Sequence, residues 1–141
     1  MSKDVWSLDV FRRAYALSLD VHRASLEFPK LEQYGGIADQ LRRSSKSVCA
    51  LLSEGAGRRA NSDAEFRRCV VMALGSAEEA KLWCLYARDL GYAGPPATLA
   101  WQSGFEEIAR MLQGLLKRLA PNAWRQTPDD FFLACCLKTD S

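Results

Sequence analysis

Apolar residues recur every three to four positions in four separate stretches of the chain. These stretches cover residues 10–24, 37–51, 66–87 and 101–119. Such spacing keeps one side of an α-helix against partner helices through several turns. Proline, glycine or polar residues separate the stretches, and short links favour antiparallel neighbours. The pattern predicts an all-α protein, an antiparallel up-down four-helix bundle with a short C-terminal extension.

Residues that interrupt helices set the expected limits of the first two. Phe28-Pro29 ends the first helix near residue 25, because the residue before a proline avoids the helical region. The second helix is expected from about residue 36 to residue 54. Gly55 then suits its C-terminal cap, where a left-handed backbone is needed.

The limits of the third and fourth helices carry clearer signals. Ser62 and Glu65 fit a capping box, in which the serine accepts from the third amide and the glutamate reaches back. We expect this helix to reach residue 90 and to stop at Gly91. The fourth helix is expected over residues 97–119, before Pro121. The bundle thus occupies residues 1–120 and a tail occupies residues 121–141.

The tail differs in character from the bundle. Thr127 and Asp130 resemble another capping pattern, so a short docking helix is expected over residues 128–137. Its large apolar residues are Phe131, Phe132, Leu133 and Leu137. They form too apolar a group for solvent, so we expect them to dock on the bundle, on another subunit or on a partner.

Length and composition place the chain among ordinary globular domains. Its 141 residues suffice for one domain with a core, and no apolar run approaches the roughly 18–20 residues that span a bilayer. The N-terminus, MSKDVWSLDVF, lacks a secretory pattern, so a cytoplasmic location is expected. The five cysteines form no C-x-x-C pair. Buried free thiols are the favoured interpretation, with a disulfide or metal site as the alternative.

The sequence offers little to catalysis. His22 is the one histidine, and it cannot build a zinc site with cysteines of this spacing. Acidic residues stand in adjacent pairs, which point about 100° apart on a helix and cannot share a site. The glycine-rich phosphate loop and the hydrolase motifs are absent. We expect no enzyme, cofactor, metal or small-molecule substrate.

Charge is unevenly distributed although the net charge is only +2. Residues 40–70 hold seven basic and three acidic residues, whereas residues 71–141 hold seven and eight. The basic residues of the first segment are Arg42, Arg43, Lys46, Arg58, Arg59, Arg67 and Arg68. Guanidinium groups bind phosphate through paired hydrogen bonds, which indicates a nucleic-acid interface. The alternative is a solvated helix face with pairs four apart, Asp39 with Arg43 and Asp63 with Arg67.

Several short motifs, in order, resemble one known family. They comprise Phe28-Pro29, Glu32, Tyr34-Gly35, Gln40-Leu41-Arg42-Arg43-Ser44, Ser47-Val48, Glu54-Gly55, Arg58, Glu65-Phe66, Ala73, Gly75-Ser76, Glu79 and Leu90-Gly91-Tyr92. Together they are similar to the bacterial four helix bundle protein family, known from intervening sequences of large-subunit ribosomal RNA. The accessory variability determinant of diversity-generating retroelements resembles this family in fold. The resemblance covers residues 8–120, and the chain departs from the family's usual proline and asparagine at Cys49 and Leu51.

The resemblance implies a homopentamer that binds RNA or DNA through a basic surface and, in its retroelement form, a reverse transcriptase. It also draws attention to Arg43 and Glu79, which border apolar stripes and are expected to form a partly buried ion pair. Trp83 and Tyr86 widen the apolar face of the third helix, which indicates a subunit interface or additional core. A homo-oligomeric protein-interaction scaffold that uses the apolar tail, without nucleic acid, is the alternative function.

Overall fold

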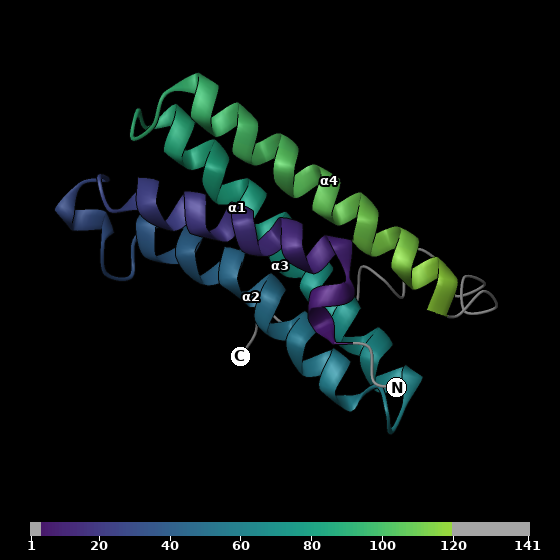
Figure 1. Ribbon diagram of the computed structural model, residues 1–141. Coiled ribbons are helices and arrows are strands. Elements are labelled where there is room, and N and C mark those ends of the chain that lie inside the picture. The colour runs from purple at the N-terminus through teal and green to yellow at the C-terminus, as the bar shows by residue number, and fades with distance from the viewer. Residues whose placement is uncertain (1–3, 120–141) are drawn as a thin grey trace, which may run out of the picture.

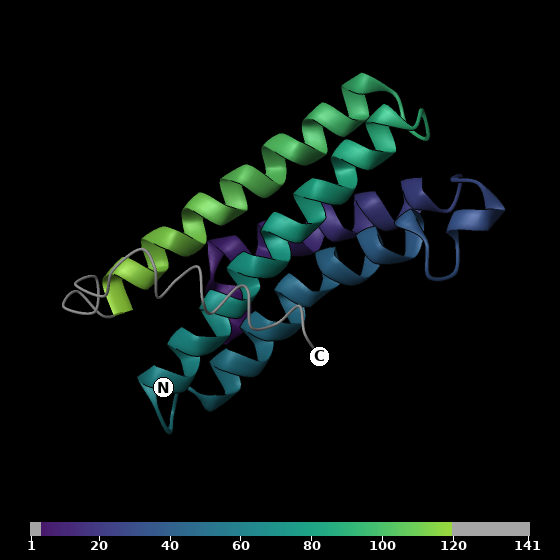
Figure 2. The same cartoon turned by 180° about the vertical axis from the view of Figure 1, so that it is seen from behind.

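The computed structural model describes residues 4–119, which fold into four long helices (Figure 1). The elements in order are the 3₁₀ turn η1 (Val5–Ser7), α1 (Asp9–Ser25), the 3₁₀ turn η2 (Lys30–Glu32), α2 (Ile37–Arg58), α3 (Asp63–Asp89) and α4 (Pro95–Leu119). Consecutive helices run antiparallel, as the ribbon shows from both sides (Figure 2). The predicted all-α antiparallel four-helix bundle is confirmed.

The helices do not contact one another equally. The α2–α3 contact is the most extensive, followed by α3–α4 and α1–α2, while α1 and α4 contact each other least. Phe66, Phe105, Leu41, Leu52 and Leu112 are among the fully buried side chains that fill the centre. The core therefore lies along α2, α3 and α4, and the α1–α4 seam is the weakest of the bundle.

Helix α2 is one turn longer than expected, and Gly55 lies inside it instead of capping it. Gly55 is buried, and a Cβ placed there would lie 2.7 Å from the Cβ of Cys69 and 3.0 Å from Cδ2 of Phe66. The glycine therefore permits close approach of α2 and α3, and the helix continues to Arg58. The prediction of a cap at Gly55 is wrong because packing, not backbone conformation, requires the glycine.

Both ends of α3 follow the sequence signals. The Ser62 hydroxyl accepts a hydrogen bond from the amide of Glu65 at 3.3 Å. At the other end Gly91 has a φ of 75°, and the amide of Tyr92 donates to the Ala87 carbonyl at 2.8 Å. This is a Schellman-type ending, which requires a left-handed residue after the helix.

The α1–α2 connection is fixed by Arg42, a residue that the sequence suggested for phosphate binding. One guanidinium nitrogen of Arg42 donates to Oγ of Ser25 at 2.8 Å and to Oε1 of Gln33 at 3.1 Å. The other donates to the Gln33 carbonyl at 2.8 Å. These bonds join the end of α1 to the loop before α2, so Arg42 serves the fold.

Glu32 joins this same connection to the α3–α4 turn. One of its carboxylate oxygens accepts from the amide of Ile37 at 2.6 Å, and the other accepts from the Tyr92 hydroxyl at 3.0 Å. The hydrogen bond to Glu32 is the main cause that raises the pKa of Tyr92. The rings of Phe28 and Tyr92 lie 5.7 Å apart. Several motif residues of the resemblance thus hold the two loops at this end together.

Some predictions lie beyond residues 4–119. The tail helix over 128–137 and the docking residues Phe131, Phe132, Leu133 and Leu137 are outside the described residues. Within the described part of the chain, no helix is long and apolar enough to cross a membrane.

Candidate nucleic-acid interface

Four of the seven predicted basic residues meet at the α2–α3 hairpin. Arg58 ends α2 and Arg59 follows it, while Arg67 and Arg68 lie in the second turn of α3. The connection between the two helices is short, and the capped start of α3 fixes its direction. The sequence therefore brings four guanidinium groups to one end of the bundle.

The two loop arginines are held by local contacts that phosphate can replace. Arg58 pairs with Glu54 at 2.9 Å, and Arg59 pairs with Asp63 at 3.5 Å. The guanidinium of Arg59 also lies over the ring of Phe66, 4.8 Å from its centroid. Exposed pairs of this kind contribute about 0–1 kcal/mol, so a phosphate group can compete for either arginine at low cost.

The two arginines of α3 are less well partnered. Arg68 is exposed and makes no ion pair with any of residues 4–119. Arg67 is half-buried, and its Nε is buried without a hydrogen-bond partner in the described part of the chain. The alternative pairing of Asp63 with Arg67 is not formed, because Asp63 lies against Arg59. A buried donor without an acceptor costs about 1–3 kcal/mol, and because this Nε is enclosed, a phosphate could reach it only if the Arg67 side chain turned outward.

Arg43 and Lys46 lie further along α2, on its exposed side. The exposed positions 43, 46, 50, 53, 54, 57 and 58 follow one another at helical spacing, so both residues share a face with Arg58. The fifteen positions from Arg43 to Arg58 correspond to about 22 Å along the helix. The basic residues thus form an elongated surface with a dense end at the hairpin, which we call the basic face: Arg43, Lys46, Arg58, Arg59, Arg67 and Arg68.

Neighbouring groups adjust the charges at the far end of the basic face. The amide of Gly35 and then Arg43, at 3.1 Å, lower the pKa of Asp39. Nζ of Lys46 lies 2.9 Å from Nδ1 of His22. Burial, followed by Lys46 and other cations, lowers the pKa of His22. His22 is therefore neutral at pH 7 and adds no charge to the face.

The predicted ion pair between Arg43 and Glu79 is wrong. The Arg43 side chain is 75% exposed and pairs with Asp39, on its own helix. Glu79 is also exposed and accepts a hydrogen bond from Nε1 of Trp83 at 3.2 Å. The two charges point to solvent from different helices, because each has a partner on its own helix, Asp39 for Arg43 and Trp83 for Glu79.

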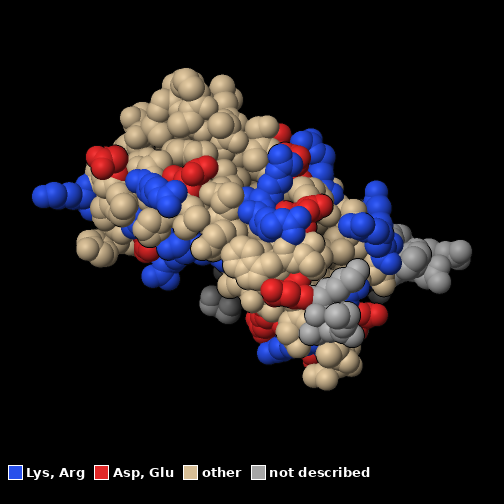
Figure 3. Space-filling view, viewed as in Figure 1, with Lys and Arg blue, Asp and Glu red and all other residues tan. Residues whose placement is uncertain are grey.

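The α3–α4 hairpin, at the opposite end of the bundle, is uncharged. Residues 90–105 contain no acidic or basic side chain, and Arg88 and Asp89 just before them pair with each other at 2.9 Å. Figure 3 shows the uncharged surface over the α3–α4 hairpin. The exposed large apolar residues at this end, the apolar end, are Leu26, Leu31, Tyr34, Leu82, Tyr86, Leu90 and Leu99.

The predicted interface residues belong to this apolar end. The rings of Trp83 and Tyr86 lie 5.7 Å apart; Trp83 is partly buried and Tyr86 is 47% exposed. Sequence reasoning missed Leu31 and Tyr34, which are 87% and 93% exposed. Helical periodicity does not apply to a loop, so it gave no signal there. The charge-free run from residue 90 could have identified the rest of the surface.

The cysteines of the described region are free thiols, as predicted. Cys49, Cys69 and Cys84 form no disulfide, and burial raises the pKa of Cys49 to about 11 and that of Cys84 to about 12. Thiols with such pKa values are weak nucleophiles at neutral pH. Residues 4–119 contain no cluster of His, Cys, Asp or Glu that could hold a metal ion.

The fold and its surfaces define a class: a small antiparallel four-helix bundle with a basic face and an apolar end. The family model described as "23S rRNA-intervening sequence protein" matches residues 7–114. The chain belongs to this family, and the resemblance found in the sequence is confirmed.

A solved structure supports the fold independently. It is a crystal structure of a protein with unknown function from the S23 ribosomal protein family of Bacteroides thetaiotaomicron. The two chains superpose with a TM-score of 0.68 at 19% sequence identity, over 77% of this chain and 98% of the other. A comparison with curated proteins finds no match.

Proposed function

We propose that this protein is a non-enzymatic, homo-oligomeric nucleic-acid-binding protein that holds RNA on its basic face. The observation that carries the proposal is the convergence of Arg58, Arg59, Arg67 and Arg68 at one hairpin, continued along α2 by Arg43 and Lys46. A linear array of cations suits a polyanion, because each phosphate contact releases condensed counterions.

Family membership supports RNA as the ligand to test first. The family takes its description from an intervening sequence in 23S rRNA. That description names where the family is found and gives no binding activity, so a DNA duplex of the same sequence belongs in every experiment. The finer version, an accessory factor of a ribosomal RNA intervening sequence or of a diversity-generating retroelement that brings RNA to a reverse transcriptase, is part of this proposal.

The apolar end supports self-association. Interfaces between subunits are poor in charge and rich in aromatic residues at their centre. The α3–α4 part of the apolar end has both properties: residues 90–105 carry no charge, and Trp83 and Tyr86 lie close to Leu82 and Leu90 on α3. We propose that copies of the chain, five by the family resemblance, join through this end. Such an assembly would leave the arginines of the α2–α3 hairpin exposed, so that several basic faces could bind one RNA molecule.

Two pairs of glutamine substitutions, which lower the net charge equally, test the proposal. Arg58→Gln with Arg68→Gln removes two cations from the basic face. Arg23→Gln with Arg110→Gln removes two exposed cations that lie on α1 and α4. Binding of fluorescein-labelled RNA and DNA duplexes is measured by fluorescence anisotropy, and the oligomeric mass of each variant by light scattering.

The first pair should weaken RNA binding about tenfold. A charge-assisted contact is worth up to about 1.5–3 kcal/mol and less when it is exposed, and two exposed contacts are lost. The second pair should change it little, and all variants should keep the mass of the parent. Equal weakening by both pairs would show that RNA is attracted by the net charge alone, and would refute the claim that it binds the basic face.

The alternative function is a protein-interaction scaffold without nucleic acid, and the apolar end is the observation in its favour. A scaffold would keep its oligomeric mass and show no RNA binding in either pair of variants. Leu82→Glu with Tyr86→Glu separates the two properties: under our proposal it breaks the oligomer, while each free subunit retains weak, salt-sensitive RNA binding.

A further inference from the structure

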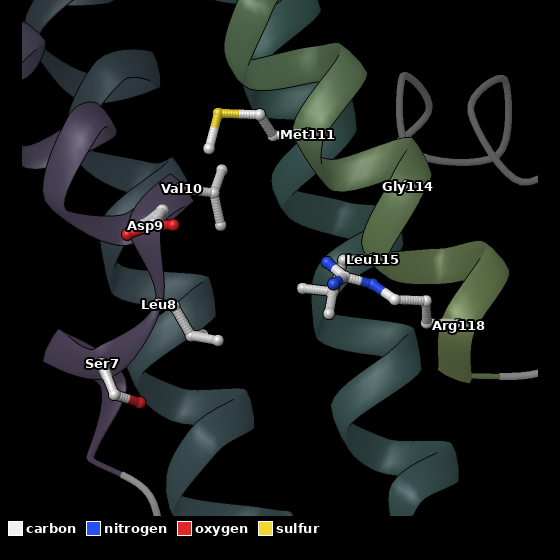
Figure 4. Close-up of a pocket in the computed structure, with 8 residues that line it drawn as sticks. All are labelled: Ser7, Leu8, Asp9, Val10, Met111, Gly114, Leu115 and Arg118. Atoms are coloured by element: carbon white, nitrogen blue, oxygen red, sulfur yellow. The ribbon is translucent and has the colours of Figure 1, made fainter.

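A groove lies along the weakest seam of the bundle, between the start of α1 and the last turns of α4. Its volume is about 340 Å³, at the lower end of the range for small-ligand sites. Leu8 and Val10 line one side and Met111 and Leu115 the other (Figure 4). Gly114 lies between Met111 and Leu115 in the sequence of α4, and a Cβ placed on it would meet no atom within 4 Å. The groove is therefore open and unfilled by the described residues, with an apolar part that is bordered by Ser7, Asp9 and Arg118.

One cation, at the rim of this groove, has no ion-pair partner among residues 4–119. Arg118 lines the groove, is exposed and makes no ion pair with any residue from 4 to 119. In Figure 4 its side chain extends toward the groove from the last turn of α4. Asp9, on the other rim, is already paired with Arg12. The groove thus combines an apolar part with a positive charge that the described residues leave unpaired.

The sequence after α4 has the complementary pattern. Helix α4 ends at Leu119, and 22 residues follow. Asp129 and Asp130 directly precede Phe131 and Phe132. The two acids can pair with the cation Arg118, and the two aromatic side chains can contact the apolar part of the groove. Each phenylalanine can bury about 150–250 Å², which is a large gain for so short a segment.

The connecting chain is long enough for this contact within one molecule. The twelve residues from Leu119 to Phe131 reach about 40 Å when extended. From Leu119 back to Met111 the helix measures only about 12 Å. A tether of this length keeps the segment at a local concentration in the millimolar range, well above that of a separate partner.

We propose that residues 129–137 fold back into the α1–α4 groove of their own chain. Phe131 and Phe132 lie on the lining of Leu8, Val10, Met111 and Leu115, and Asp129 or Asp130 pairs with Arg118. The proposed occupant is the tail of the same chain, whereas the sequence alone also allowed the tail to dock on another subunit or on a partner.

Cysteine cross-linking tests the proposal on the full-length chain. Gly114→Cys places a thiol in the groove, where it can form a disulfide with Cys135 or Cys136 of the tail. Gln113→Cys, one position earlier, places a thiol on the exposed side of α4 and is the matched control. Each variant is oxidised at several protein concentrations, and the products are identified by non-reducing electrophoresis and peptide mass spectrometry.

The proposal expects a disulfide within single chains of Gly114→Cys, at a rate independent of protein concentration and about tenfold above that of Gln113→Cys. Equal rates for the two variants would overturn it. Disulfides between chains alone would also overturn it, because the groove would then hold a neighbour's tail.

A charge reversal tests the ionic part separately. Arg118→Asp should slow cross-linking of Gly114→Cys, and adding Asp129→Arg with Asp130→Arg should restore the rate. An unchanged rate in the Arg118→Asp variant would overturn the pairing of Arg118 with the tail. RNA takes no part in these reactions, so their outcome is independent of the proposed function.

Discussion

Gly55 provides a quantitative test of how α2 and α3 approach each other at the basic face. Alanine is favoured over glycine inside a helix by about 0.5–1 kcal/mol. At position 55 the added methyl would lie 2.7 Å from the Cβ of Cys69 and 3.0 Å from the ring of Phe66. Neither is the free end of a flexible side chain, so the helices must separate.

Such overpacking costs about 1–3 kcal/mol, which exceeds the gain in helix propensity. We therefore expect Gly55→Ala to lower the free energy of unfolding by about 1–2 kcal/mol. Gly57→Ala is the matched control, because position 57 is exposed on the same helix and its new methyl meets nothing within 4 Å. It should raise the free energy of unfolding by about 0.5–1 kcal/mol.

Urea unfolding followed by circular dichroism measures both variants at one protein concentration, since oligomers unfold in a concentration-dependent way. With slopes of about 1–3 kcal/mol/M, the midpoints should move in opposite directions and differ by about 1 M. A midpoint for Gly55→Ala at or above that of Gly57→Ala would refute the close packing of α2 and α3.

Two further predictions concern the end of the molecule where the two loops meet. Arg42→Ala should lower the free energy of unfolding by about 2 kcal/mol, because it removes charge-assisted hydrogen bonds that fix the α1–α2 connection. Arg43→Ala should change it by less than about 0.5 kcal/mol; equal effects in chemical unfolding would contradict the separate roles. The hydrogen bond to Glu32 holds the pKa of Tyr92 above its usual 10.0. This contribution is complete below pH 10 and is lost as the pH rises through the raised pKa. Tyr92→Phe should reduce the alkaline fall of the melting temperature, and an identical pH profile would contradict it.

The long helices were predictable because each had a periodic stripe, and local signals near Pro29 and Gly91 marked the ends of α1 and α3. Ser62 and Gly91 act through their own backbone or neighbouring amides, so their roles follow from a few adjacent residues. Glycine is also the residue expected at a helix cap, but the role of Gly55 depends on its contacts with Phe66 and Cys69 across the α2–α3 interface. A single helix therefore cannot distinguish a capping glycine from one required for close packing.

The candidate site shows the same division. Clustering of Arg58, Arg59, Arg67 and Arg68 follows from a short hairpin between two recognisable helices. Arg42 has the same charge as Arg43, yet it turns toward Ser25 and Gln33, and no pattern of charge along the chain reveals those partners. The direction of a long side chain depends on acceptors brought near by the fold.

Polarity along the bundle axis connects these observations. The α2–α3 hairpin presents arginines, whereas the α3–α4 hairpin at the other end is uncharged and exposes Leu90 and Leu99. An assembly through the apolar end would leave the arginines of the α2–α3 hairpin free in every subunit. The proposed separation of self-association from RNA binding follows from this polarity.

The salt dependence of RNA binding tests the central claim most directly. For duplex RNA, the logarithm of the association constant is measured against the logarithm of salt concentration for the parent chain and for both pairs of glutamine variants. Each lost phosphate contact should reduce the slope by about 0.9. The account predicts a slope smaller by about two per contacting subunit for Arg58→Gln with Arg68→Gln, and an unchanged slope for Arg23→Gln with Arg110→Gln. Equal slopes for all three proteins would contradict it.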